Sequence, residues 1–254
     1  LKVPVFISIL SGSMAYFYLT GGPFTKILGQ RVLAGVESIP LLAIPFFILA
    51  GNLMNKGGIA IRLINFAKIF TGSIPGALAH TNAVANMLFG AISGSGTAAA
   101  SAMGSIIGPI EEEEGYDRAF SAAANIATAP TGLLIPPSNV MITYSLVSGG
   151  TSVAALFMAG YIPGILMGLG SMVVAFLYAK KHNYPVSGRA SASEALKVTL
   201  EALPSLLLIV IVIGGIVGGI FTATEGAGIC VLYCLILSAV SYTHLRAHET
   251  SQDL

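Results

Sequence analysis

Five long runs without any charged residue most constrain how this chain can fold. An α-helix needs roughly 17–25 apolar residues to cross a bilayer, and each run reaches or approaches that length. Only 9% of the residues are charged, against about 25% in soluble domains. The sequence therefore predicts an all-α, polytopic membrane protein. The runs are Val3–Thr20, Ile39–Asn55, Ala119–Ser148, Val153–Ala179 and Ser205–Thr222.

The two ends of the chain differ from its interior. The chain begins Leu1-Lys2-Val3-Pro4, without Met or a signal-peptide layout, so we expect the natural N-terminus to lie upstream. Residues 241–254 ("SYTHLRAHETSQDL") turn abruptly polar after an apolar helix. We interpret them as a non-native tail that resembles read-through from a cloning vector.

A glycine-rich stretch interrupts the apolar pattern from Gly90 to Ile106, "GAISGSGTAAASAMGSI". Glycine and serine clusters mark turns, and a turn exposes backbone groups that hydrocarbon cannot satisfy. The stretch therefore predicts a helical hairpin over residues 75–110 whose tip lies in protein or in a water-filled cavity. We expect its first arm to end near Ile92 and its second to begin near Thr97, capped by Ser95 or Thr97.

The basic residues indicate how this hairpin sits in a membrane. If residues 75–110 enter and leave on one face, nine of the twelve basic residues share that face, whereas a full crossing divides them. The positive-inside rule makes that face cytoplasmic. The four glutamates Glu111–Glu114 then form a solvated loop without chemistry. The nine are Lys2, Lys56, Arg62, Lys68, Arg118, Lys180, Lys181, Arg189 and Lys197.

A second interruption lies in residues 118–150. Pro136 and Pro137 have no N–H group, so the carbonyls of Gly132 and Leu133 lose their helical partners. Two interrupted helices that both expose oxygen atoms at membrane depth are typical of sodium-coupled secondary transporters. We therefore predict a sodium site at Ser93, Ser95, Gly132 and Leu133. The side chains of Thr131, Ser138, Asn139 and Thr143 supply further oxygens to this break.

Simpler interpretations exist for the same polar residues. Breaks of this kind also occur for packing alone. Asn82, Asn86 and Asn125 fit helix bridges as well as a binding site. We interpret His80, the one histidine inside an apolar segment, as an interhelical hydrogen bonder rather than a proton carrier.

Other classes of function fit less well. Neither Ser93 nor Ser95 lies in a glycine-x-serine motif, and zinc ligands at workable spacing are absent from the sequence, so we expect no enzyme. Cys230 and Cys234 lie one helical turn apart, and no other candidate metal ligand is nearby. We therefore interpret them as small apolar helix residues and not as a metal site or a disulfide. A net charge of +1 gives no indication of a nucleic-acid partner. A channel-type or non-transporting scaffold subunit remains the alternative.

Several segments resemble the large membrane subunit of TRAP transporters, the DctM-like permeases. The resemblance spans Val3 to Val240 and rests on four motifs in the same order. They are "ESIPLLAIPFFILAGNLMNKGGIAIRLINFA", "GAISGSGTAAASAMGSIIGPI" followed by "EGYDRAFSAAA", "IPPSNVMITYSLVSG" and "GGIFTATEGAG". Many relatives have Thr-Pro-Thr-Glu where this chain has Thr222-Ala223-Thr224-Glu225, so this turn departs from the family pattern.

The resemblance implies a function and a set of site residues. It implies an elevator-type, sodium-driven importer of an organic acid in the bacterial inner membrane, with no cofactor besides Na⁺. The implied partners are a periplasmic substrate-binding protein and a small four-helix membrane subunit. Family substrates include C4-dicarboxylates, sialic acid and keto acids. The family's hairpin-tip and broken-helix residues map onto Ser93, Gly94, Ser95, Gly96, Thr97, Thr131, Gly132, Pro136, Pro137 and Ser138.

The resemblance and the charge pattern together predict five regions. The chain then corresponds to the first of two inverted repeats plus the start of the second. Because every basic residue lies outside the apolar runs, this half would hold an acid by helix N-termini, hydroxyls and sodium. The regions are 1–74 (scaffold helices and an amphipathic arm), 75–180 (hairpin and broken helix), 181–204 (cytoplasmic amphipathic arm), 205–240 (start of the second repeat) and 241–254 (tail).

Overall fold

The computed structural model describes residues 3–21, 29–30, 32–35, 37–188 and 190–252. Every regular element in these ranges is helical, which confirms the all-α prediction. The chain divides into two compact units, residues 1–39 and 40–254. The first contains α1 (Val5–Thr20), which ends where Gly21 takes a left-handed conformation with φ of 67°.

The second unit contains all the candidate site residues. The short 3₁₀ helix η1 (Ile39–Leu42) begins at the last residue of the first unit and leads into α3. The remaining helices are α3 (Ala43–Lys56), α4 (Ile59–Thr71), α5 (Ala77–Ser93), α6 (Gly96–Glu113), α7 (Arg118–Thr128), α8 (Thr131–Leu134), α9 (Asn139–Val147), α10 (Val153–His182), α11 (Ala192–Val217) and α12 (Ala223–Gln252).

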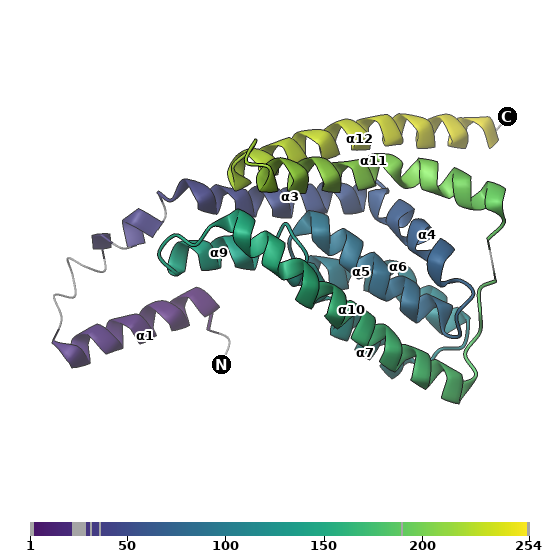
Figure 1. Ribbon diagram of the computed structural model, residues 1–254, viewed down its shortest axis with the longest axis horizontal. Helices are drawn as coiled ribbons and strands as arrows, with labels where there is room; N and C mark the ends of the chain where they lie inside the picture. Colours follow the sequence, from purple (N-terminus) through teal and green to yellow (C-terminus); the bar gives the residue numbers. More distant parts are fainter. Residues whose placement is uncertain (1–2, 22–28, 31, 36, 189, 253–254) are drawn as a thin grey trace. The chain divides into compact units, whose positions relative to one another are not determined.

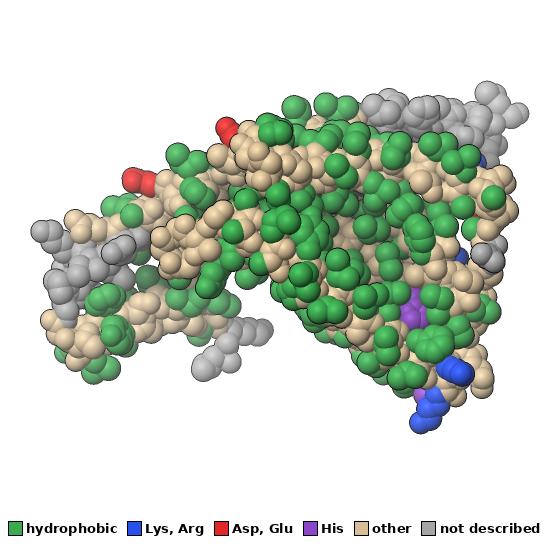
Figure 2. Space-filling view, in the orientation of Figure 1, with side chains coloured by type: hydrophobic (Ala, Val, Ile, Leu, Met, Phe, Trp, Pro, Cys, Tyr) green, Lys and Arg blue, Asp and Glu red, His purple; other side chains and the backbone are tan. Residues whose placement is uncertain are grey.

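The length and composition of the helices fit a membrane protein. Among the described residues, three segments are long and apolar enough to cross a bilayer: Ile39–Lys56, Val153–His182 and Ala192–Val217. Val5–Thr20 and Ala223–Ala239 are apolar but shorter. Apolar side chains cover much of the face in Figure 2, and basic side chains gather at its lower right end, where Figure 1 shows the end of α10. A surface this apolar is stable in lipid but not in water.

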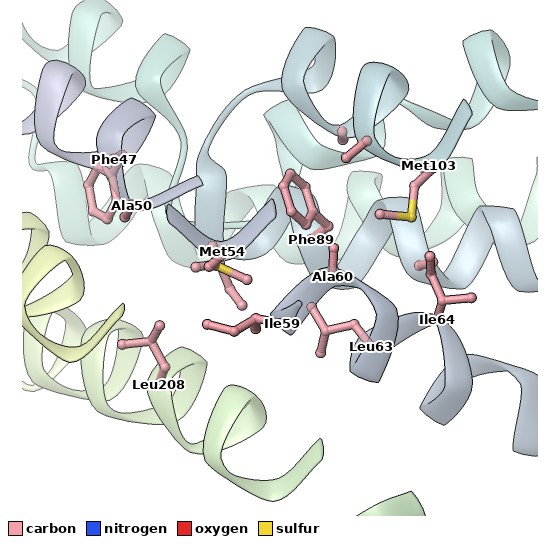
Figure 3. Close-up of a cluster of buried hydrophobic side chains, with 14 of the residues drawn as sticks. Phe47, Ala50, Met54, Ile59, Ala60, Leu63, Ile64, Phe89, Met103 and Leu208 are labelled. Carbon is pink, nitrogen blue, oxygen red and sulfur yellow. The ribbon is translucent and has the colours of Figure 1, made fainter. Parts of the chain in front are cut away.

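The helices of the second unit pack around one apolar core. In Figure 1, α3, α11 and α12 lie along one side, and α5, α6, α7 and α10 form a second bundle. Helix α4 contacts both groups through α5 and α11. The core therefore lies where the groups meet (Figure 3). It includes Phe47 and Met54 of α3, Leu63 of α4, Phe89 of α5 and Leu208 of α11.

The structure adds two details around the predicted start of the second repeat. Helix α11 runs without interruption across residue 204, where the sequence divides the amphipathic arm from the next repeat. The turn that lacks the usual proline is closed by Thr222 and Glu225 instead. The Glu225 carboxylate accepts bonds of 2.8 Å from both the backbone N–H and the hydroxyl of Thr222. The Glu225 N–H donates back to that hydroxyl at 3.3 Å, which completes a capping box at the start of α12.

Candidate functional site

The hairpin turns within two residues. Helix α5 ends at Ser93, and Gly94 follows in the left-handed conformation with φ of 62°, which favours glycine. Ser95 is extended, and its hydroxyl accepts from the Ala98 N–H at 3.3 Å, so Ser95 is the N-cap of α6. The turn therefore directs the carbonyl end of α5 and the N–H end of α6 to the same place, as the sequence predicts.

Both ends of the hairpin return to one segment after α10. The Gly76 N–H, at the start of α5, donates to the Pro185 carbonyl at 3.2 Å. After α6, the Asp117 N–H donates to the Tyr184 hydroxyl at 3.0 Å, and the rings of Tyr116 and Tyr184 stack at 4.4 Å. The two arms are thus antiparallel, with a shared base and a single tip.

The second interruption divides one helix into three pieces, α7, α8 and α9. The chain is non-helical at residues 135–138, where Pro136 and Pro137 provide no N–H group. The Ser138 hydroxyl substitutes for the missing donor, because it bonds the Leu133 carbonyl at 2.5 Å while it caps α9 at the Met141 N–H. The Leu133 carbonyl, which the sequence predicts to be unpaired because Pro137 has no N–H group, therefore accepts a hydrogen bond from Ser138.

The tip of the hairpin contacts this break directly. The Asn139 N–H, at the start of α9, donates to the Gly94 carbonyl at 3.2 Å. A Cβ atom added at Gly94 would lie 3.1 Å from the Pro137 carbonyl oxygen and 3.2 Å from Asn139 Oδ1. Asn139 Oδ1 is buried and has no hydrogen-bonding partner within the described part of the chain. The contact therefore contains several oxygen atoms around one turn.

One turn further from the tip, α5 and α8 meet through glycines. A Cβ atom at Gly90 would lie 2.1 Å from the Gly132 Cα atom, and one at Gly132 would lie 2.6 Å from the Gly90 Cα atom. No side chain fits between these backbones. The two glycines thus let the helices approach closely enough for the tip to meet the break.

Glycines of two other helices support the tip and the break. Gly51 of α3 packs on the fully buried Ser93, whose Cβ atom would lie 2.7 Å from an added Cβ. Gly160 and Gly164 of α10 pack against Leu134 and Ile135, with added Cβ atoms 2.3 and 2.6 Å from the nearest atoms. Helix α3 thus supports the tip and α10 supports the break, each through close glycine contacts.

Nearer the base, an asparagine network joins α5 to α7. The Asn86 side-chain nitrogen lies 2.8 Å from Asn82 Oδ1, 3.0 Å from Asn125 Oδ1 and 2.9 Å from Thr128 Oγ1. Asn125 in turn donates to the Ala100 carbonyl of α6 at 2.8 Å. Both arms of the hairpin are therefore hydrogen-bonded to α7.

These contacts define what the site could bind. The groups at the tip are neutral oxygens and the N–H groups of the first turn of α6, which have no helical acceptors. Within the described residues, no three His, Cys, Asp or Glu side chains lie close enough to hold a metal ion. Neutral oxygens suit a hard monovalent cation, and the N–H groups of this turn that Ser95 does not cap suit an anion.

A scan against protein-family models gives one decisive match. The model of the tripartite ATP-independent periplasmic (TRAP) transporter, DctM component, matches residues 1–254. The chain belongs to this family. DctM proteins are transporter permeases and not enzymes, so the prediction of the family and that of a non-enzymatic function are both confirmed.

Several curated proteins are similar to this DctM chain. The protein named "Uncharacterized protein YgiK" of Salmonella typhimurium is 52% identical over 92% of this chain and 59% of its own length. The sialic acid TRAP transporter large permease SiaM of Vibrio cholerae is 40% identical over 96% of this chain and 57% of its length. The C4-dicarboxylate large permease DctM of Pseudomonas aeruginosa gives the same figures. The chain thus spans somewhat more than half the length of these relatives.

The structure of this DctM chain brings most of the predicted site residues together, though not all face one point. Thr97 is exposed and bonds Ser95 at 3.0 Å. Thr131 is fully buried, and its hydroxyl donates to the Thr128 carbonyl at 2.6 Å. Thr143 is exposed and donates to the Asn139 carbonyl of its own helix at 2.9 Å. The closest contacts between tip and break involve Gly94, Gly96, Leu133, Pro137 and Asn139.

Sequence reasoning missed the close glycine contacts of the permease. The signal was present, because Gly160, Gly164 and Gly168 recur every four residues, as in small-xxx-small motifs of membrane helices. A similar rule applies to α5, where Asn82, Asn86, Gly90 and Gly94 fall on one helix face at spacings of four. That face meets the broken helix along its length.

Two interpretations of single residues were wrong. The ring nitrogens of His80 have no hydrogen-bonding partner among the described residues; the ring lies near Phe176 of α10, with centroids 6.5 Å apart. The glutamates 111–114 are not simply a solvated loop. Helix α6 continues to Glu113, and Glu111 is only 1% exposed because its face of α6 lies against α7.

Proposed function

We propose that this chain is the transport-bearing part of a sodium-coupled importer of an organic acid, located in a bacterial inner membrane. Contact between the hairpin tip and the broken helix carries this proposal. Alternating access by a rigid element is simplest when the ion and the substrate bind where two broken elements meet. The relatives named for sialic acid and C4-dicarboxylates support an acidic substrate.

The sodium site of the proposal lies at this contact. Ser93, Ser95, Gly132 and Leu133 are its first candidates, and the orphaned Asn139 Oδ1 adds a fifth oxygen. A carbonyl oxygen has two lone pairs, so the Leu133 carbonyl retains one for an ion beside its bond from Ser138. Sodium bound there would in turn place a positive charge beside the N-terminus of α6, where a carboxylate could bind.

The proposal includes two protein partners. A periplasmic substrate-binding protein would deliver the acid, and a small four-helix membrane subunit would brace the permease. Both follow from membership of a tripartite transporter family. The alternative is a channel-type or scaffold subunit, which would not accumulate a substrate against its gradient.

Uptake into proteoliposomes tests the proposal. The complete permease, with its small subunit and its binding protein, should accumulate radiolabelled sialic acid or a radiolabelled C4-dicarboxylate under an inward sodium gradient. Potassium should not replace sodium. Ser95→Ala and Asn139→Ala should raise the sodium concentration for half-maximal uptake several-fold. The matched control is Ser105→Ala, whose hydroxyl only bonds the Ala102 carbonyl of α6.

The result that would overturn the proposal is equally clear. Uptake that never exceeds equilibrium, or that is the same in potassium as in sodium, would favour the channel. Unchanged sodium dependence in both variants would remove the tip from the sodium site.

The orientation of the hairpin has its own test. Single cysteines at Ser73 and Glu113, which are exposed beside the hairpin base, should both react from the cytoplasmic side with a membrane-impermeant maleimide. A cysteine at Thr151, which is exposed after α9, should react from the opposite side. Labelling of Ser73→Cys and Glu113→Cys from opposite sides would show a full crossing instead of a re-entrant hairpin.

A further inference from the structure

A polar cavity lies at the base of the hairpin, apart from the tip. Its volume is about 350 Å³. Asn82 of α5, Glu111 of α6, and Ser121 and Asn125 of α7 contribute to its lining. The cavity therefore lies between both arms of the hairpin and the helix that carries the break.

Two buried groups in this cavity lack partners. Glu111 is 1% exposed and Ser121 is 8% exposed. In the part of the chain that the structure describes, neither Glu111 Oε1 nor Ser121 Oγ makes a hydrogen bond. A buried, ionised carboxylate without partners costs several kcal/mol, so the charge must be neutralised or paired.

The charged neighbours of Glu111 do not supply this pairing. Glu112 and Arg118 line the same cavity, but both side chains are exposed to solvent. Glu114 adds negative charge nearby. Helix α5 contributes His80 as its one titratable group, and its ring lies near Phe176 and not on the cavity.

The electrostatics of the base agree with this geometry. Burial, with a smaller contribution from the charge of Glu114, raises the pKa of the Glu111 carboxyl to about 7. The Ser121 hydroxyl is close enough to lower this pKa, although the two groups are not in hydrogen-bonding geometry. Tyr116, whose pKa is raised to about 12 chiefly by burial, stays neutral beside them.

We propose that Glu111 is a proton-binding site at the base of the hairpin, which holds a proton while α6 packs against α7 and releases it to water when they separate. A protonated carboxyl group has the O–H donor that an ionised one lacks. Either form of Glu111 could bond the Ser121 hydroxyl after a small rotation, since a hydroxyl both donates and accepts, but only the protonated form avoids a buried charge. The inference rests on the base alone and not on sodium coupling at the tip.

The first test compares thermal unfolding of the complete permease and Glu111→Gln in detergent across pH. Because the folded pKa is raised, the stability from this group is present at low pH and lost as pH rises through about 7. The Gln side chain mimics the protonated form. The midpoints of the two proteins should agree near pH 5, and Glu111→Gln should melt roughly 5 °C higher near pH 8. The exposed Glu113→Gln is the control and should follow the parent.

The second test detects the proton and the opening directly. The infrared C=O band of a protonated carboxyl group should be present at pH 6, weaken by pH 8, and be absent at both values in Glu111→Gln. A cysteine at Ser121 should react with a maleimide faster at pH 8 than at pH 6, by a larger factor than an exposed control cysteine at Ser73, whose rate rises only with the thiolate fraction. In the Glu111→Gln background the two cysteines should show the same factor.

Three results would overturn the proposal. The first is that the thermal midpoints of the parent and Glu111→Gln show the same dependence on pH. The second is a pH-dependent infrared band of a protonated carboxyl group that survives in Glu111→Gln. The third is a thermal midpoint that depends on sodium concentration and not on pH. If Glu111→Gln does not fold, the infrared band and the labelling of Ser121→Cys with Glu111 intact still decide. The absence of both pH effects would then refute the proton site.

Discussion

The hairpin meets the broken helix through backbone atoms at its tip and through polar side chains at its base. At the tip, Gly90 lies against Gly132 and the Gly94 carbonyl bonds the Asn139 N–H. At the base, Asn86 of the hairpin bonds Asn125 of α7, and Asn82 and Glu111 line a cavity beside α7. Backbones in contact cannot adjust, whereas side chains around a cavity can reorient. The comparison indicates a rigid joint at the tip and an adaptable one at the base.

The largest effect should come from a methyl group at the tip. In Gly90→Ala the new Cβ atom would lie 2.1 Å from the Gly132 Cα atom, so α5 and α8 must separate. We expect the free energy of unfolding to fall by about 3 kcal/mol or more, or the protein not to fold. Thermal unfolding and the yield of folded protein measure this loss of stability. Gly170→Ala of α10, which has open space around it, is the control. A fully stable Gly90→Ala would show that the tip is not rigid.

Removal of the asparagine hub should have the second-largest effect. Asn86→Ala deletes contacts to Asn82, Asn125 and Thr128. The Asn86 amide shares two N–H groups among these three oxygens, and its loss leaves buried acceptors without a donor, so we expect the free energy of unfolding to fall by about 2 kcal/mol. The exposed Asn52→Ala should change stability little. Equal midpoints for the two variants would contradict the importance of the network.

A smaller loss of stability should follow from removal of the N-cap of α9, beside the tip. Ser138→Ala removes the N-cap of α9 and the donor to the Leu133 carbonyl. Lost caps typically cost about 1 kcal/mol, which a drop in thermal midpoint should report. Thr143→Val on the same helix removes only a local bond to Asn139 and should be nearly neutral. The idea of a capped break fails if both variants melt alike.

The smallest effect should be close to zero, at the base. Apart from its chain neighbours, a Cβ atom at Gly108 of α6 would meet nothing within 4 Å, but Pro109 disfavours a Cβ on the residue before it in a helix. Gly108→Ala should therefore change the free energy of unfolding by less than about 0.5 kcal/mol, because the lower entropy of the unfolded chain and the contact with Pro109 oppose each other. The difference in free energy of unfolding between Gly108→Ala and Gly90→Ala, measured under identical conditions, compares the base of the hairpin with its tip most directly. A similar loss in both variants would remove the distinction between tip and base.

The sequence by itself determined the features that depend on neighbouring residues. The lengths of the apolar runs predicted the membrane helices, because the bilayer sets the length. The glycine after Ser93 and the cap at Ser95 predicted the hairpin turn, since only a few residue types suit such positions. Pro136 and Pro137 predicted the break, because they lack a donor. The family motifs predicted the class of transporter.

Only the tertiary structure decided which groups have partners. The serine that replaces the donor at Leu133, the three oxygens around Asn86 and the contact of Gly90 with Gly132 depend on which helix faces meet. The burial of Glu111 has the same origin, since four consecutive glutamates look alike in a sequence and the packing of α6 against α7 covers only one. Local patterns fix helices and turns, but burial and hydrogen-bonding partners arise between segments that lie far apart in the chain.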